Sequence, residues 1–406
     1  MRYMQKTLVI GLAIIMAQMD VWAGDVTISV RNQEKVQRQE VIEVDLKTVT
    51  DKLGLKEGET FVVKNPIGQQ VDYQITYDKK LLIDAAVRPS GTMKFLVTKG
   101  TPKQMKVWVY GRMYPDRKDD IAWENDRGAY RVYGPALQKT GERSFGIDVW
   151  TKNTSDLDVG ERYLKNDYAW VHLKELRKKG KMQEAKEYGL NTSFHLDHGT
   201  GLDCYNVGPS LGCGTPALMD GEKLILPYCY KDYDILDNGP LRFTVDLVYG
   251  KEKVRNDSVT EHRLISLDKG SNFNKMTVWY EGLSKPATFC SGVVIHSDDK
   301  ESVVLGKEFV QYADPTDGPD RHNFQIYVAA LFPNGAQTRK LMYAKPENGI
   351  EGHAIGVVKG LKDKEKYTYY FGSAWSAYDV RTQQEWQLRI DEFLNALHSP
   401  LQITVQ

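Results

Sequence analysis

Motifs that mark the most common enzyme classes are missing from this sequence. It has no GxxxxGK[ST] phosphate-binding loop, no GxGxxG pattern and no HExxH pair. These absences argue against nucleotide use, Rossmann-type redox chemistry and common hydrolase chemistry. Net charge is lacking as well, because 54 Lys and Arg balance 54 Asp and Glu. No basic stripe indicates a nucleic-acid partner.

Cysteine is scarce. The four cysteines are Cys204, Cys213, Cys229 and Cys290, and none stands in a CxxC pair, so a zinc-ribbon interpretation has little support. In an exported protein four cysteines permit disulfides, and Cys204 and Cys213 are the nearest pair in the sequence. Buried thiols explain the four residues equally well.

Long apolar runs are absent beyond the N-terminus, so no membrane span is expected there. Residues 1–23 have the pattern of a secretory signal peptide: a basic start, a short apolar core over residues 8–16, and the small residue Ala23. We therefore expect a periplasmic or secreted protein with no membrane contact after cleavage. A buried N-terminal helix is the alternative interpretation of this segment.

The rest of the chain has the pattern of a mainly β protein in two domains. Over residues 24–110, apolar and polar residues alternate, as at Val26, Ile28 and Val30, which predicts a small antiparallel β-sandwich. Residues 111–406 hold many strand-like runs separated by turn residues, which predicts a large antiparallel pair of sheets. One helix is expected over residues 168–187, and an amphipathic helix near the C-terminus.

A stretch from residue 119 to residue 150 combines aromatic and charged residues. Sugar sites need aromatic faces for the apolar side of a ring, and planar charged groups for its hydroxyls and carboxylate. On a strand, Arg127 and Arg131 share one face, which suits an anionic ligand through bidentate pairing. The alternative is a lattice of ion pairs buried between sheets. The other candidate ligand-binding residues here are Trp123, Tyr133, Asp148 and Trp150.

A second stretch, which begins at His195, is dense in His, Asp and Gly. If it is strand-like, His195 and Asp197 face the same way and form a His–Asp base or half of a metal site. Tyr205 offers a phenol that can act as acid or base, and His198 is a second candidate acid. Asp203 is expected to bind ligand. We favour chemistry without a cofactor; Ca²⁺ or Zn²⁺ is the alternative, although no established ligand spacing is present.

Two residues of later strand-like runs are candidates of second rank. Arg263 and His353 each stand in a polar cluster and are expected to contact the ligand. For His353 the alternative is a structural histidine whose ring nitrogens are satisfied within the fold.

The segments DDIAWENDRGAYRVYGPAL, GIDVW and FHLDHGTGLDCYNVGPSLGCG resemble an exported bacterial family catalogued as a domain of unknown function. Its members occur in polysaccharide-utilisation gene clusters beside lyases and unsaturated glucuronyl hydrolases. The resemblance covers nearly all of the chain after residue 23. It implies a galactose-mutarotase-like β-supersandwich preceded by a small β domain, and kinship with the oligosaccharide dehydratase of ulvan breakdown. The family has an aromatic residue before the first His; here it is Phe194, which cannot do the chemistry of a Tyr.

The resemblance implies a uronic-acid-containing oligosaccharide or polysaccharide as partner, and β-elimination as the reaction. The enzyme would be a dehydratase if C4 of the sugar bears a hydroxyl, and a lyase if it bears a glycosidic oxygen. We expect Arg127 or Arg131 to neutralise the carboxylate. His195 or Tyr205 would take the proton, and Tyr205 or His198 would protonate the leaving oxygen.

Two other classes of function stay open. One is a glycoside hydrolase with paired carboxylates, either Asp148 with Asp203 or Glu124 with Asp126. The other is a sugar-binding or mutarotase-like protein that makes no covalent product.

Overall fold

The structure is a computed structural model that describes residues 24–297, 299, 301–315 and 323–406. The expected signal peptide, residues 1–23, lies outside the described residues. Within them, no helix is both long enough and apolar enough to cross a membrane. The described chain is mainly β with antiparallel sheets, which confirms the fold class expected from the sequence.

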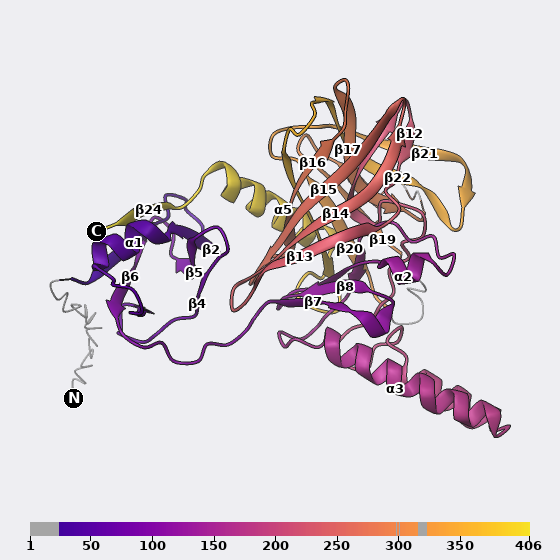
Figure 1. Ribbon diagram of the computed structural model, residues 1–406, viewed down its shortest axis with the longest axis horizontal. Helices are drawn as coiled ribbons and strands as arrows, with labels where there is room; N and C mark the ends of the chain where they lie inside the picture. Colours follow the sequence, from indigo (N-terminus) through magenta and orange to yellow (C-terminus); the bar gives the residue numbers. More distant parts are fainter. Residues whose placement is uncertain (1–23, 298, 300, 316–322) are drawn as a thin grey trace, which may run out of the picture.

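The first unit is a small β-sandwich, coloured indigo in Figure 1. The alternation in its first strand buries Val26, Ile28 and Val30 on one face, as a period of two requires. Ile42 and Val44 of the facing sheet complete this core. The expected small sandwich is therefore confirmed. Its elements are β1 (Val26–Arg31), β2 (Arg38–Asp45), α1 (Leu46–Leu53), β3 (Phe61–Lys64), β4 (Tyr73–Ile75), β5 (Lys80–Val87) and β6 (Thr92–Lys99).

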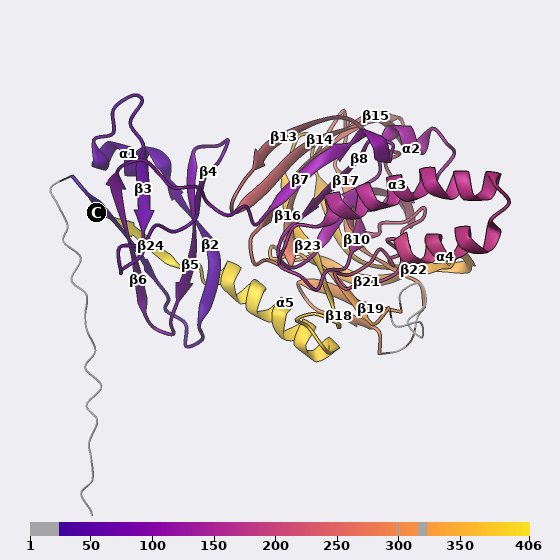
Figure 2. The same ribbon diagram turned by 90° about the horizontal axis from the view of Figure 1, so that it is seen from below.

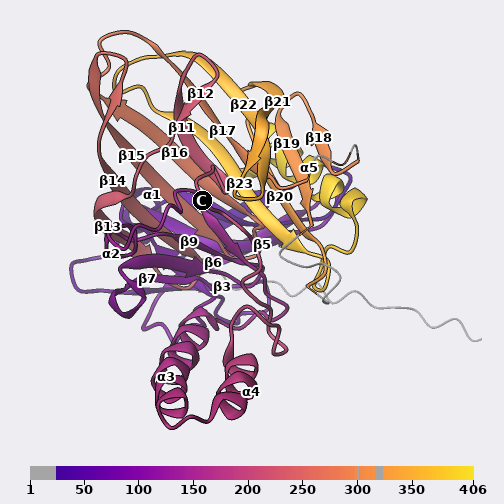
Figure 3. The same cartoon turned by 90° about the vertical axis from the view of Figure 1, so that its right-hand side faces the viewer.

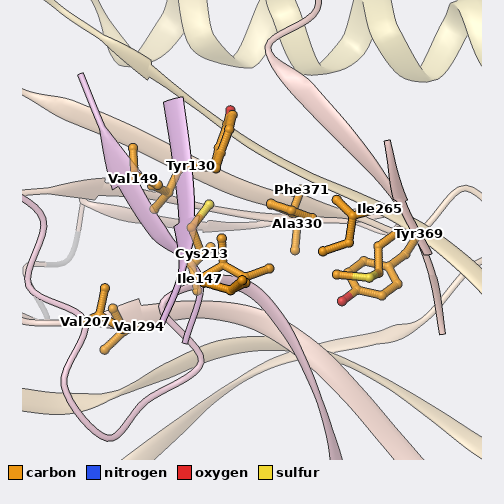
Figure 4. Packing of buried hydrophobic residues seen from close by; sticks show 14 of the residues in the cluster. Tyr130, Ile147, Val149, Val207, Cys213, Ile265, Val294, Ala330, Tyr369 and Phe371 are labelled. Atoms are coloured by element: carbon orange, nitrogen blue, oxygen red, sulfur yellow. The ribbon is translucent and has the colours of Figure 1, made fainter. Parts of the chain in front are cut away.

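The second unit is a large sandwich of two sheets. Over the described residues, one sheet has the order β13-β14-β15-β16-β23-β20-β19-β18 and the other β12-β11-β17-β22-β21. Ile265 and Phe371 of the first sheet and Cys213 and Val294 of the second belong to one buried cluster (Figure 4). The strands are β11 (Cys213–Asp220), β12 (Lys223–Ile225), β13 (Tyr230–Asn238), β14 (Arg242–Val254), β15 (Asp257–Asp268), β16 (Phe273–Glu281), β17 (Ala287–Ile295), β18 (Val303–Leu305), β19 (Phe309–Asp314), β20 (Ile326–Leu331), β21 (Gln337–Glu347), β22 (Ile350–Leu361) and β23 (Tyr367–Trp375).

A smaller sheet, in the order β10-β9-β8-β7, carries the first sequence motif and leads into a helical hairpin. Helices α3 and α4 lie side by side and project away from the sheets (Figures 2 and 3). The single helix expected over residues 168–187 was wrong, because Gly180 takes a left-handed conformation (φ 72°) and separates two helices. The elements are β7 (Tyr110–Tyr114), η1 (Pro115–Arg117), β8 (Asp120–Glu124), β9 (Ala129–Val132), α2 (Pro135–Gln138), β10 (Asp148–Trp150), α3 (Val159–Lys178) and α4 (Met182–Thr192).

The end of the chain returns to the first unit. The expected C-terminal helix is present as α5 (Gln383–His398), which runs from the large sandwich toward the small one (Figure 2). After it, β24 (Gln402–Val405) pairs antiparallel with β1, with Ile28 opposite Val405. The side chain of Arg38 donates to the backbone carbonyls of Ala396 and Ser399, which satisfies carbonyl groups at the C-terminal end of α5.

None of the four cysteines forms a disulfide in the described residues. Burial raises the pKa of the Cys290 thiol to about 12, and it also raises the pKa of Cys213. Cys204, Cys213 and Cys290 are buried thiols in this structure, as one of the two interpretations expects, and Cys229 is half-buried.

Candidate functional site

The two sequence motifs meet at Arg131. Strands β9 and β10 pair in a register that sets Arg131 opposite Asp148, and the Arg131 Nη2 atom lies 2.5 Å from Asp148 Oδ2. The same nitrogen lies 3.2 Å from Asp203 Oδ2, which comes from the second motif. Arg131 Nη1 lies 3.8 Å from Asp120 Oδ2 on β8. One guanidinium therefore faces three carboxylates, and all four residues are buried.

The charges in this cluster do not balance, which sets the protonation of Asp148. Burial raises its pKa to about 7, Arg131 opposes that rise, and Asp203 adds to it. Burial also raises the pKa of Asp120. For Arg131, burial disfavours the charged form, but the neighbouring carboxylates outweigh it and keep the pKa well above its ordinary value. The guanidinium stays charged, and Asp148 takes up a proton near neutral pH.

Aromatic rings enclose the ionic cluster. The indole Nε1 of Trp150 donates to Asp148 Oδ2 at 3.0 Å, and the Arg131 guanidinium lies 5.2 Å from the Trp150 ring centre. Phe194 stacks on Trp150 at 5.0 Å between centroids, and Tyr163 of α3 meets Trp150 edge-on. Tyr133, which is half-buried, has its hydroxyl 3.3 Å from Arg131 Nη2. The rings pack around the buried carboxylates, and the Tyr133 phenol lies beside Arg131.

His195 lies above this cluster with 64% of its side chain exposed. Its Nδ1 atom is 2.9 Å from the backbone carbonyl oxygen of Asp203. A carbonyl oxygen can only accept, so Nδ1 carries the hydrogen, and in the neutral ring Nε2 holds the lone pair. Asp197 does not hold His195, since its carboxylate accepts from the backbone N–H groups of Gly199 and Gly201. The His195 ring is thus oriented by the backbone and presents Nε2 to solvent.

Sequence reasoning missed Arg117, a cation that packs on the same Phe194 ring as His195. Its guanidinium lies 5.1 Å from the centre of the Phe194 ring and 5.2 Å from that of Tyr163, and the His195 ring lies 4.4 Å from Phe194. Among the residues that the structure describes, Arg117 makes no ion pair within 4 Å, and it is only half-buried. In the sequence it stands in a charged segment that looks like a linker, just before the motif. It is therefore available to an anion that binds near the Phe194 ring.

Three of the predicted residues belong to the packed interior instead. Trp123 is fully buried and donates from Nε1 to the side chain of Asn274 at 2.8 Å. Arg263 is buried between the sheets. Its Nε atom lies 2.6 Å from Glu261 Oε1, and its Nη1 atom donates to the Tyr249 hydroxyl at 2.7 Å. His353 is also fully buried.

His353 and Arg127 have separate local roles. The backbone N–H of Leu211 donates to His353 Nε2 at 3.2 Å, and burial lowers the pKa of His353 to about 3, so this ring is neutral. Arg127 pairs with Asp379 rather than with the Arg131 cluster. The common face that the sequence assigned to Arg127 and Arg131 does not form, because Arg127 lies in the turn between β8 and β9 and not on a strand.

The two remaining catalytic candidates are also apart from Arg131. His198 is exposed, and its Nε2 lies 2.9 Å from the backbone carbonyl of Ser193. Tyr205 is buried, its hydroxyl has no hydrogen-bond partner in the described part of the chain, and its ring meets His296 edge-on at 6.0 Å. Burial raises the pKa of Tyr205 well above its ordinary value, so the phenol is neutral.

The carboxylates that the hydrolase hypothesis needs are engaged by protein groups. Glu124 accepts from the backbone N–H groups of Asp158 and Val159 at the start of α3, and from the buried Lys152. Asp126 accepts from the backbone N–H of Gly270. Asp148 has no exposed surface.

One motif of common hydrolases is present, contrary to the expectation that such motifs are missing: residues 208–212 have the pattern GxSxG. Its serine, Ser210, is fully buried and donates to the backbone carbonyl of Val207 at 2.6 Å. It therefore stabilises a turn and is not placed as a nucleophile.

No group of three or more His, Cys, Asp and Glu side chains among the described residues is arranged to hold a metal ion. The three carboxylates around Arg131 already face a guanidinium. Ca²⁺ or Zn²⁺ as a cofactor stays an untested alternative.

Fold and site together define a two-unit antiparallel β protein with an ionic cluster buried under an exposed histidine. The chain belongs to the family described as a domain of unknown function, DUF4861, which matches residues 30–403. The family expected from the two motifs, one of unknown function, is thereby confirmed; the kinship with the ulvan dehydratase stays a prediction. The chain is 27% identical over 339 residues to "Uncharacterized protein P7" of Formosa agariphila, covering 80% of this chain and 78% of that protein.

Solved structures resemble the chain more distantly. An alpha-mannosidase from Enterococcus faecalis V583 has a TM-score of 0.49 at 10% identity, over 95% of this chain and 46% of that one. A glycosyl hydrolase family 38 protein from Enterococcus faecalis gives 0.49 at 10% identity, over 94% and 47%. This chain spans about half the length of both.

Proposed function

We propose that the protein is a carbohydrate-active lyase or dehydratase that acts by β-elimination on uronic-acid-containing oligosaccharides. The observation that supports this proposal is the orientation of His195. Its Nδ1–H is held by the Asp203 carbonyl, so an exposed Nε2 lone pair is ready to accept a proton without any rearrangement. Arg117, against the same Phe194 ring, supplies the positive charge that a carboxylate-bearing substrate needs.

The proposed reaction uses these groups in one sequence. Arg117 neutralises the uronate carboxylate, which makes the proton on C5 more acidic. His195 Nε2 takes that proton, the electron pair forms the C4–C5 double bond, and the C4–O bond breaks. The Tyr133 phenol, beside Arg131, donates a proton to the leaving oxygen, which departs as water or as a sugar hydroxyl. Solvent returns the His195 proton to Tyr133, so the net change is elimination.

Arg131 acts differently in this proposal from the role expected from the sequence. Its Nη2 already meets Asp148 and Asp203, so it has little capacity left for a substrate carboxylate. It holds Asp203 in place, and Asp203 in turn holds His195. We therefore propose Arg131 as a positioning residue and Arg117 as the carboxylate ligand.

The test is near-ultraviolet absorbance of the protein mixed with a panel of uronic-acid oligosaccharides, with and without chelator. A 4,5-unsaturated uronate absorbs there. His195→Ala should lower kcat about 100-fold or more, and Arg117→Ala should lower kcat/KM. The control is His398→Ala, an exposed histidine at the C-terminal end of α5, which should leave the rate unchanged. Loss of the signal with chelator would show that a metal ion, and not Arg117, binds the carboxylate of the substrate.

Two results would reject elimination. New reducing ends without absorbance would support a glycoside hydrolase. Saturable binding with no covalent product would support a sugar-binding or mutarotase-like protein. A periplasmic or secreted location, also a proposal, is tested by fractionating cells that express the full chain.

A further inference from the structure

A cavity lined by several cations lies at the end of the large sandwich and belongs to no part of the site described above. Its volume is about 370 Å³, within the range of small-ligand sites. It is lined by the tip of the β14–β15 hairpin, by the β11–β12 hairpin and by the segment between α2 and β10. The charged residues of its lining are Arg143, Lys223, Lys253, Arg255, Asp220 and Glu347.

The cations of this cavity outnumber its acids by four to two. Arg143 lies 3.9 Å from Glu347. Lys223, Lys253 and Arg255 are exposed and make no ion pair with any residue that the structure describes. The whole chain has no net charge, so positive charge is concentrated at this cavity relative to the rest of the protein. This concentration favours binding of an anion there.

The backbone explains why the positive charges gather there. Lys253 lies on β14, where alternate residues share a face, and Val254 between the two cations is buried. Arg255 follows in the tight turn with a left-handed conformation (φ 57°), so it stays on the exposed side of the hairpin tip. Lys223 opens β12 on the neighbouring hairpin.

Five apolar residues also line the cavity. They are Phe145, Pro209, Leu224, Ile225 and Leu226, and all five are half-buried. An aromatic ring and aliphatic groups beside four cations suit a sugar ring that bears an acidic substituent, because the ring packs on the apolar side chains and the acid meets the cations. A bare inorganic anion would leave the apolar side chains uncovered.

The cavity adjoins both sequence motifs. The segment between α2 and β10, which contributes Arg143 and Phe145, ends at Asp148 of the ionic cluster. The backbone N–H of Phe145 donates to the carbonyl of Gly208, in the segment that follows Tyr205. We infer that this cavity is a second sugar subsite, which binds a carboxylate- or sulfate-bearing residue of the same anionic glycan that reaches His195. The inference rests on the proposed function only in joining the cavity and His195 through one glycan. Binding of an anionic sugar at the cavity stands without it.

The test measures binding by calorimetry on the full chain with His195→Ala, so that no turnover interferes. The probes are a uronate hexasaccharide, a neutral-backbone hexasaccharide bearing sulfates, an uncharged hexasaccharide and a single-stranded oligonucleotide of equal charge. The double variant Lys253→Ala/Arg255→Ala should bind the anionic glycans about tenfold more weakly and with a shallower salt dependence. Phe145→Ala should lower the affinity for every glycan that the protein without this substitution binds. The matched control is Lys174→Ala, which removes an exposed, unpaired charge on α3 and should change nothing.

Unchanged affinity in the double variant, equal loss for the uncharged sugar, or equally tight binding of the oligonucleotide would overturn the inference. Whichever of the two anionic glycans binds more tightly identifies the acid. Failure of this inference differs from failure of elimination: the near-ultraviolet signal of the wild-type protein persists in the first case and is absent in the second.

Discussion

The guanidinium of Arg131 lies 2.5 Å from the carboxylate of Asp148, at directly paired positions of β9 and β10. Asp203 and Asp120 crowd the same guanidinium from other segments. The cluster therefore joins the two sequence motifs electrostatically.

Replacing Arg131 by Met should destabilise the protein by about 3–5 kcal/mol, because it leaves three buried carboxylates without a cation. Denaturant unfolding measures the change. Arg127→Met offers the comparison: its pair with Asp379 is partly exposed, so the loss should be about 1 kcal/mol. Equal losses of unfolding free energy in the two variants would show that the Arg131 cluster stabilises the fold no more than the Arg127–Asp379 pair does.

The stability should fall as pH rises from about 4 to about 7, through Asp148. Its pKa is raised to about 7 in the folded protein, whereas an unfolded Asp titrates near 4. Between these values the folded state binds the extra proton, so ionisation of the unfolded state favours unfolding. Because one proton is involved, the free energy of unfolding should fall by at most about 1.4 kcal/mol per pH unit.

Asp148→Asn isolates that contribution. The variant should show a flatter pH dependence of the free energy of unfolding than the wild type over pH 5–7, and parallel behaviour above it. Parallel curves throughout would mean that Asp148 is ionised in the folded protein across this range.

Glu124→Gln should loosen the helical hairpin without unfolding the sandwich. The Glu124 carboxylate accepts from the first backbone N–H groups of α3 and pairs with the fully buried Lys152. A neutral amide leaves that ammonium uncompensated. Hydrogen exchange should accelerate in α3 and α4 first. Glu161→Gln, an exposed residue of the first turn of α3 that pairs with Lys165, is the control and should have little effect.

Thiol titration should find four reactive thiols in the unfolded protein and a slow reaction with Cys229 alone in the folded one. Cys229 is half-buried, and Cys204, Cys213 and Cys290 are buried. A count of two in the unfolded protein under non-reducing conditions would reveal a disulfide.

Local patterns predicted much of the fold. The alternation of Val26, Ile28 and Val30 shows directly which face of β1 is buried, because a strand repeats every two residues. The density of charge around Arg131 also pointed to the site. The arrangement found there, a guanidinium among three buried carboxylates, is the buried ion-pair lattice that the sequence offered as its alternative.

Other features depend on long-range packing and leave no local signal. Trp123 was expected at a sugar, but it lies in the core because β8 runs across the large sheet and sets its indole against Asn274. Arg117 became a candidate only when folding brought Phe194 and Tyr163 beneath it. Tyr205 and His195 stand ten residues apart, yet one is buried and the other exposed.

The pairing of β24 with β1 also sets an order of events during synthesis. The strands β1 to β6 leave the ribosome some 300 residues before their last partner is made. Until then the outer edge of β1 has unpaired N–H and C=O groups, which another strand could capture. The small sandwich is thus completed only after β24 has been made, although its other strands are made far earlier.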